Sequence, residues 1–273
     1  MIPSNNVIST RSNPVVRRLR SVRDGDEKKL IFVEGEKLIE ELAKSKIHVE
    51  SVYCFLEQEK AVSDIFKEHS RPIPKITFLS NDVMAFVSDL QTPPGMIAVA
   101  KRPEVKGPRP GGPRPDGGDS NSLILVLHEL QLPQNVGALF RTAEASGVSE
   151  VWCVGRSVDP FNPKVIRGSM GSVFRVPHNL FSGLTKAMEE LSARGIKTIG
   201  ASQHGTTSYD QVDWRSACAL LLGSEGKGFS ETDLPALSET IQIPMKGLVE
   251  SLNVGTAAAV CLFEAARQRR NAV

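Results

Sequence analysis

The chain has 273 residues, of which 40% are hydrophobic and only 5% aromatic, a composition typical of a soluble globular protein with room for two domains. Its apolar stretches, such as residues 123–127, are far shorter than the roughly 20 residues of a membrane-spanning helix, so no such helix is predicted. The formal net charge is only +2, which neither requires nor excludes a polyanionic partner.

The beginning of the chain is locally basic. Residues 1–23 contain no acid and five arginines, Arg11, Arg17, Arg18, Arg20 and Arg23. An acid-poor segment with serine and arginine is also typical of a mitochondrial transit peptide. Pro14, followed by apolar residues at helical spacing, instead favours a short folded helix. The arginines then form either a surface for nucleic acid or a solvated helix face.

Residues 1–102 alternate helical and strand patterns and predict a small α/β sandwich domain. We expect helices near 13–23, 35–46, 57–69 and 81–87, and strands at 30–33, 49–55, 76–79 and 96–100. Residues 103–121 are rich in proline, glycine and charge and carry no periodic apolar pattern. This segment is predicted to be a linker between two domains, with mobility because it buries little apolar surface.

Residues 122–273 form the second predicted domain, in which short apolar strands alternate with helices. The strands are LILVLH, VWCVG, IKTIGA, ACALLLG and TIQIP, and the helices lie near 136–147, 184–194 and 253–270. This alternation predicts a parallel sheet covered on both faces. Ligands of such sheets bind at the carboxyl ends of the strands.

Three segments that follow apolar strands carry candidate site residues. In residues 128–147, Asn135 and Gly147 are placed to cap the two ends of a helix, which is a purely structural interpretation. Arg141, flanked by apolar residues on that helix, must reach either solvent or an anion. Asn135 and Arg141 are six residues apart, so their spacing does not make them partners.

The second segment, 219–230, runs from a strand into Gly223 and Gly226, which offer backbone donors and close approach to a nucleotide-like ligand. It lacks the spacing of a P-loop, and Glu225 is an acid that a simple turn does not need. In the third segment, 243–270, Ser251 and Asn253 stand at the entrance of a helix that begins with small residues. They can either cap that helix or face a ligand.

Together these segments resemble the three motifs of the SpoU family, the ribose 2'-O branch of the SPOUT RNA methyltransferases. The motifs are NVGALFRTA, LLLGSEGKGF and IPMKGLVESLNVGTAAAV, and the resemblance covers residues 123–270 in the family's order. FVEGEKLIEEL and LQTPPGMIAVAKRP give a weaker resemblance to the family's substrate-binding domain, a small ribosomal-protein-like α/β module.

The resemblance implies a C-terminal SPOUT domain with a deep trefoil knot and a homodimer in which each active site is completed across the interface. It implies that S-adenosyl-L-methionine is the cofactor and RNA the substrate. The residues that match the family's catalytic set are Asn135, Arg141, Glu225, Ser251 and Asn253. Those that match its cofactor pocket are Gly223, Gly226, Ile243, Met245 and Leu252.

The implied reaction is methylation of a ribose 2'-hydroxyl in structured RNA. 23S ribosomal RNA is the favoured substrate, because the additional N-terminal module is typical of family members that act on rRNA. A free arginine stays protonated at any working pH, so Arg141 is interpreted as a phosphate clamp that also stabilises charge on the 2'-oxygen. The alternatives are methylation of transfer RNA or of a base nitrogen, and a non-catalytic RNA-binding role in ribosome assembly.

The remaining residues indicate a reducing compartment and no metal. The cysteines are widely separated and two of them lie in predicted buried strands, which favours a cytoplasmic location. The histidines and cysteines form no cluster with the spacing of metal ligands.

Overall fold

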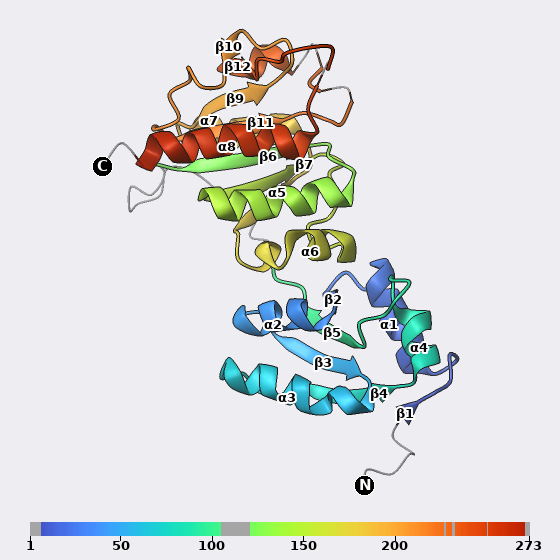
Figure 1. Cartoon of the computed structure of the whole chain (residues 1–273). Helices are drawn as coiled ribbons and strands as arrows, with labels where there is room; N and C mark the ends of the chain where they lie inside the picture. Colours follow the sequence, from blue (N-terminus) through green and yellow to red (C-terminus); the bar gives the residue numbers. More distant parts are fainter. Residues whose placement is uncertain (1–6, 105–120, 227, 231–232, 250, 271–273) are drawn as a thin grey trace. The chain divides into compact units, whose positions relative to one another are not determined.

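The computed structural model describes residues 7–104, 121–226, 228–230, 233–249 and 251–270 (Figure 1). These residues form two compact units, one of residues 1–104 with 161–174 and one of residues 105–160 with 175–273. Most of the predicted linker lies outside the described residues, and the domain boundaries at 102 and 122 stay a prediction. Within the described ranges, no helix has the length and low polarity that crossing a membrane requires.

The first unit is built on a mixed five-stranded sheet with the order β1-β4-β3-β5-β2. β5 is antiparallel to β2 and β3, whereas β1, β3 and β4 run parallel to one another. The strands are β1 (Val7–Ile8), β2 (Leu30–Glu34), β3 (Val49–Cys54), β4 (Lys75–Leu79) and β5 (Met96–Lys101).

Helices cover both faces of this sheet because alternate residues of each strand point to opposite faces. α1 (Pro14–Asp24) and α4 (Asn81–Val87) share one apolar cluster with Phe32, Tyr53 and Ile97 of the strands. α2 (Glu36–Lys44) contacts β2 and β5, and α3 (Glu59–Glu68) packs on α2. A further helix, α6 (Pro163–Ser169), packs against β2, the edge strand.

The second unit contains a seven-stranded sheet with the order β10-β12-β9-β11-β6-β7-β8, and every pairing in it is parallel. The parallel α/β sheet predicted from the sequence is therefore confirmed. The strands are β6 (Leu123–His128), β7 (Glu150–Val154), β8 (His178–Phe181), β9 (Lys197–Ala201), β10 (Thr207–Ser208), β11 (Cys218–Leu222) and β12 (Glu239–Gln242).

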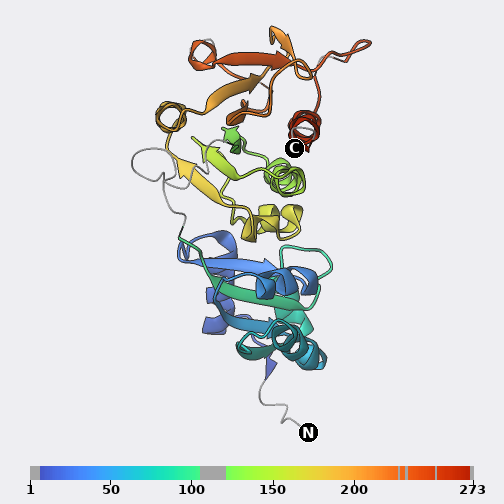
Figure 2. The ribbon, with the colours of Figure 1, turned by 90° about the vertical axis from the view of Figure 1, so that its left-hand side faces the viewer.

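Three helices cover the two faces of this parallel sheet. α7 (Leu184–Ala193) lies on one face, and α5 (Pro133–Ser146) and α8 (Val254–Arg270) pack together on the other (Figure 2). The central strands β6, β7 and β11 are buried along almost their whole length, which explains their continuous apolar sequences. The core beneath α7 includes Trp152, whose ring packs at 4.5 Å from that of Phe181.

The ends of the predicted elements agree with the structure to within a few residues, but four short elements, β1, β8, β10 and α6, were not predicted. α6 has only seven residues and β8 only four, and short elements leave too few periodic positions to be recognised. The largest shift in a boundary is at the start of α5, which begins at Pro133 rather than after Asn135. Proline is favoured at the first helical position because its φ is fixed and its missing N–H is not needed there.

Candidate active site

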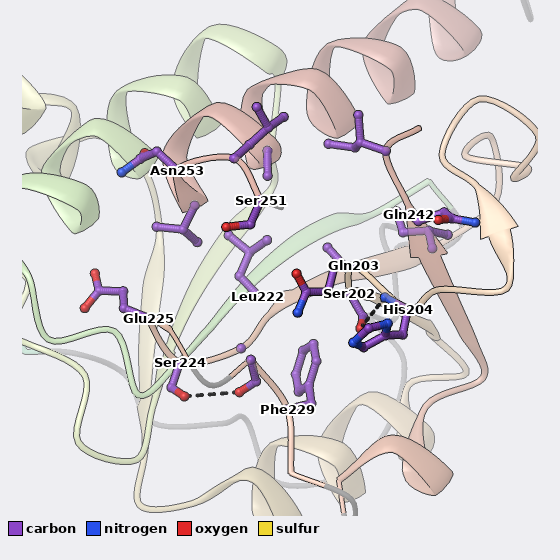
Figure 3. A pocket seen from close by; sticks show the side chains of 18 of the residues that line it. Ser202, Gln203, His204, Leu222, Ser224, Glu225, Phe229, Gln242, Ser251 and Asn253 are labelled. Carbon is purple, nitrogen blue, oxygen red and sulfur yellow. Dashed lines mark hydrogen bonds between the residues drawn. The ribbon is translucent and has the colours of Figure 1, made fainter. Parts of the chain in front are cut away.

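A cavity of about 1090 Å³ lies in the second unit, at the carboxyl ends of β9, β11 and β12 (Figure 3). Most of its lining comes from segments that follow these strands or begin α8, which lie within residues 201–204, 222–226, 228–229, 240–245 and 251–257. Leu132 and Asn135 at the start of α5, together with Leu234 and Cys261, complete the described lining. This is the edge at which open parallel sheets bind their ligands.

Glu225 is the centre of a hydrogen-bond network beside this cavity. Its Oε1 accepts a hydrogen bond from Asn135 Nδ2 at 2.7 Å, and its Oε2 accepts from the backbone N–H groups of Gln131 and Leu132, each at 3.2 Å. A carboxylate at a helix N-terminus satisfies otherwise unpaired N–H groups and interacts favourably with the helix dipole. Glu225 therefore fixes the loop after β11 to the start of α5.

The network continues to the start of α8. Asn253 Nδ2 donates to Asn135 Oδ1 at 3.2 Å, and Asn253 Oδ1 accepts from the Gly255 N–H at 2.9 Å. The capping interpretation is thus correct for Asn253, which also contacts the site, but it is wrong for Asn135. Leu132 is the N-cap of α5, and Asn135 lies within the helix with its side chain directed to Glu225 and Asn253.

The loop between β11 and Phe229 folds tightly on itself. Ser224 and Gly228 exchange two backbone hydrogen bonds of 3.0 and 2.9 Å. A Cβ atom at Gly223 would lie 2.4 Å from the carbonyl carbon of Gly228, so no larger residue fits there without moving the backbone. Gly226 has φ +83°, a conformation that L side chains rarely adopt.

The cavity wall has few charges. None of the described residues that line it is lysine or arginine, and Glu225 is the acid among them. Cys261 reaches the cavity from α8, and burial raises the pKa of its thiol to about 12. This thiol is therefore protonated at neutral pH and is a poor nucleophile toward an electrophilic ligand.

The structure brings together nine of the ten residues predicted for catalysis and cofactor binding. The residues that line the cavity are Asn135, Gly223, Glu225, Gly226, Ile243, Met245, Ser251, Leu252 and Asn253. Arg141 is the exception, since it is exposed on α5 and does not line the cavity of its own chain. It follows Asn135 by six residues, which corresponds to about 9 Å along the helix axis.

Sequence reasoning missed one side of the cavity. Ser202, Gln203 and His204 follow β9, and Gln242 ends β12; they lie across the cavity from Asn253 and Glu225 (Figure 3). Part of the signal was present, because Ser202, Gln203 and His204 directly follow the predicted strand IKTIGA, whereas Gln242 lies within the predicted strand TIQIP. These residues were not selected because they do not belong to any of the three segments from which the candidate site residues were taken.

The five arginines predicted to bind RNA lie on or just before α1, in the first unit. Arg11, Arg18 and Arg23 form ion pairs within that unit, with Asp82, Glu50 and Asp24 respectively. The cluster is therefore less available to a ligand than its sequence indicates.

Comparison with known families agrees with the geometry of this site. Residues 122–263 match the model of the SpoU rRNA methylase family, and residues 13–98 match that of the MRM3-like substrate-binding domain. The chain belongs to the SpoU family. The resemblance seen in its three motifs is thereby confirmed. Glu225, Asn135 and Asn253, which form the hydrogen-bond network, each belong to a different one of these motifs.

The SpoU relatives include proteins that match almost the entire chain. A tRNA/rRNA methyltransferase of Synechocystis sp., named as uncharacterized, is 30% identical over 96% of this chain and 94% of its own. The 23S rRNA (guanosine(2553)-2'-O)-methyltransferase RlmP of Bacillus subtilis is 28% identical over 90% of this chain and 92% of its own. The crystal structure of an AdoMet-bound rRNA methyltransferase from Sinorhizobium meliloti has the same fold, with a TM-score of 0.81, 23% identity and coverage of 95% and 97%.

Proposed function

We propose that this SpoU protein transfers a methyl group from S-adenosyl-L-methionine to a ribose 2'-hydroxyl in structured RNA, with 23S rRNA as the favoured substrate. The observation that carries the proposal is the network of Glu225, Asn135 and Asn253, which joins all three SpoU motifs at the rim of one cavity. The choice of 23S rRNA is supported by the name of the RlmP relative, which matches along most of both chains.

The cavity fits the proposed methyl donor in size and chemistry. Its volume of about 1090 Å³ is slightly above the usual range of about 300–1,000 Å³ for small-molecule sites, so it has room for such a ligand. Gly223 and Gly226 line it with main chain, and Ile243, Met245 and Leu252 add apolar residues. When bound, S-adenosyl-L-methionine supplies an electrophilic methyl group on a sulfonium. The protonated thiol of Cys261 would not compete for that methyl group.

Gly223→Ala is expected to weaken binding of S-adenosyl-L-methionine without unfolding the protein. Its Cβ would displace the backbone of Gly228, and overpacking of this kind costs about 1–3 kcal/mol, which corresponds to roughly 5- to 150-fold in Kd if it falls on the bound state. Isothermal titration calorimetry measures the effect. Gly183→Ala is the matched control, because nothing lies within 4 Å of a Cβ there and φ is −173°, an extended conformation. Equal affinity of both variants would place the donor elsewhere.

The 2'-hydroxyl must be held in line with the methyl group, and the described polar groups are placed to do this. Asn253 and Ser251, both exposed at the cavity, can donate or accept hydrogen bonds to a ribose. Glu225 holds the loop and α5 in place and has its oxygens occupied by donors, so we assign it a positioning role.

The cavity needs a cation for the phosphate and the developing negative charge, and the described wall supplies none. Arg141 is exposed and lies outside the cavity of its own chain. We infer that it acts in the cavity of a partner subunit, in a homodimer that uses the exposed surface of α5. Phe263 on α8, which packs against α5, is 51% exposed and would add apolar area to such an interface.

A mixed dimer of two inactive variants tests this arrangement. Arg141→Ala retains an intact cavity, and Asn135→Ala retains Arg141, so a mixed dimer would hold one complete site. Random exchange of subunits is then expected to restore about a quarter of the wild-type rate. Differently tagged subunits verify exchange. If mixed dimers form and remain inactive, Arg141 acts within its own subunit.

The second candidate function, a non-catalytic RNA-binding role, is not favoured by the site. A binding protein has no need of a cavity at whose rim one carboxylate network joins three motifs. Methylation of transfer RNA remains the alternative within the same reaction, because the name of the Synechocystis relative includes it.

The proposed activity is tested by incubating the purified protein with S-adenosyl-L-methionine carrying a labelled methyl group and unmodified transcripts of 23S rRNA or tRNA. Mass spectrometry of the nucleosides is expected to find a 2'-O-methylated nucleoside from 23S rRNA. A labelled base would contradict the ribose assignment, and labelled tRNA alone would contradict the choice of substrate. If calorimetry detects no binding of S-adenosyl-L-methionine and no RNA becomes labelled, the non-catalytic role is favoured instead.

The proposal extends to features that accompany this activity. We propose that residues 122–273 are a methyltransferase domain threaded as a trefoil knot, and residues 1–102 a substrate-binding domain. The crossing of the chain from β12, near one sheet edge, back to α8 on α5 supports the knot. A ribosomal RNA substrate also implies a cytoplasmic location.

A further inference from the structure

The two helical layers of the first unit carry opposite charge. α1 and α4 together contain four arginines against Asp24 and Asp82. α2 and α3 contain four lysines against six acidic residues. A polyanion is therefore attracted to the layer of α1 and α4 and repelled by the layer of α2 and α3.

Three of the five arginines at this layer are held by contacts within the fold. Arg11 donates two hydrogen bonds to the carboxylate of Asp82, at 3.0 and 2.6 Å. Arg18 pairs with Glu50 at 3.1 Å. The Arg23 side chain donates to Asp24 and to the carbonyl oxygen of Val87, which ties α1 to the end of α4. Donors of these three guanidinium groups are therefore already occupied by carboxylates or by a carbonyl oxygen of the same unit.

The other two arginines have no carboxylate partner among the described contacts. Arg17 is exposed on α1. Arg20 follows it by three residues, so both side chains lie on the same side of the helix. The Arg20 guanidinium lies over the ring of Phe86 at 4.6 Å, and its Nε is buried without a hydrogen-bond partner.

Phe86 orients a guanidinium without neutralising it. A cation over an aromatic face is attracted to the ring but keeps its full charge and its outward N–H donors. Arg11 also lies over Phe86, at 4.9 Å. Two guanidinium groups therefore share one ring, and Asp82 pairs with Arg11. The surplus positive charge lies at Arg20 and Arg17.

We propose that Arg17 and Arg20, on the layer of α1 and α4, bind the phosphate backbone of the substrate RNA. Arg11, Arg18 and Arg23 instead stabilise the fold of the first unit. The proposal rests on the proposed function for its ligand, and it names which two of the five arginines position that ligand. Phosphate is the group recognised, because a guanidinium donates to two of its oxygens at once.

The test measures binding of an unmodified 23S rRNA transcript to the full chain between about 50 and 200 mM salt. Arg17→Ala combined with Arg20→Ala is expected to raise Kd about 10- to 100-fold. The slope of the logarithm of the binding constant against the logarithm of the salt concentration should fall in magnitude by about 1 to 2. The matched control is Lys37→Ala combined with Lys60→Ala. It removes the same charge from two exposed residues of α2 and α3 and is expected to change Kd less than about twofold.

Two further variants separate the stacked geometry from simple charge. Arg20→Lys keeps the charge but loses the planar fork over Phe86, and an intermediate loss of affinity is expected. Arg18→Ala removes an arginine that is paired with Glu50. It should lower the Tm of the protein and leave its Kd for RNA nearly unchanged. Equal losses in the α1 double variant and in its control, or no loss in either, would overturn the proposal.

The methylation assay distinguishes this proposal from the proposed function. At saturating RNA the double variant in α1 is expected to keep the wild-type kcat and show a raised KM, because it leaves the cavity intact. Wild-type protein that binds RNA but transfers no methyl group would refute the proposed reaction alone. Active protein whose KM is unchanged by the double substitution would refute only the role of Arg17 and Arg20.

Discussion

Arg141→Ala is expected to lower kcat for RNA methylation by about 10²- to 10³-fold, the usual effect of removing one group that stabilises developing negative charge. The donor affinity should stay within about twofold of wild type, since the role proposed for Arg141 is to hold the RNA phosphate and the developing charge, not the donor. Single-turnover methylation and calorimetry with S-adenosyl-L-methionine measure the two quantities.

Arg156→Ala is the control for the Arg141 variant, because it removes another exposed arginine from the second unit. It should retain wild-type activity. Arg141→Lys should recover little of the lost rate, since an ammonium group lacks the paired donors that fit a phosphate. An Arg141→Ala protein with normal kcat would remove this residue from the mechanism.

Glu150→Ala is expected to destabilise the second unit by about 3–5 kcal/mol. The Glu150 carboxylate is buried and pairs with Arg194 at 3.1 Å, and it also accepts hydrogen bonds from Trp152 Nε1 and Asn179 Nδ2. Its removal leaves a buried guanidinium and two donors without these contacts. A fall in Tm of about 6–20 °C follows for a unit of this size.

Tryptophan fluorescence measures this loss specifically, because both tryptophans of the chain, Trp152 and Trp214, are buried in the second unit. Glu189→Ala, an exposed acid on α7, is the control and should leave Tm within about 2 °C. If the two variants melt together, Arg194 has found another partner and the buried pair contributes little.

The sequence predicted the sheet of the second unit because β6, β7 and β11 are buried on both faces and read as unbroken apolar runs. It also placed nine of ten site residues at the cavity, since glycines and polar groups directly after such strands must meet at one edge. The local sequence therefore predicts site residues where a parallel sheet brings the carboxyl ends of its strands to one edge.

What the sequence could not predict depends on contacts between distant residues. Glu225 pairs with Asn135, 90 positions away, and no local pattern indicates that its oxygens are occupied. The arginines before and on α1 look alike in the sequence, yet Asp82 and Glu50 neutralise two of them from other elements. The inclusion of residues 161–174 in the first unit likewise depends on α6 packing against β2.

The assembly of the cavity has a consequence for the life of the protein in the cell. Its wall combines residues far apart in the sequence, from Leu132 at the start of α5 to Cys261 in α8. A molecule that fills it can bind only after these segments have met, so it acts as a ligand of the finished fold. At a concentration one hundred times its Kd such a ligand adds about 2.7 kcal/mol to the free energy of unfolding. If that ligand is the proposed S-adenosyl-L-methionine, methionine starvation is expected to shorten the lifetime of this protein as well as to slow its reaction.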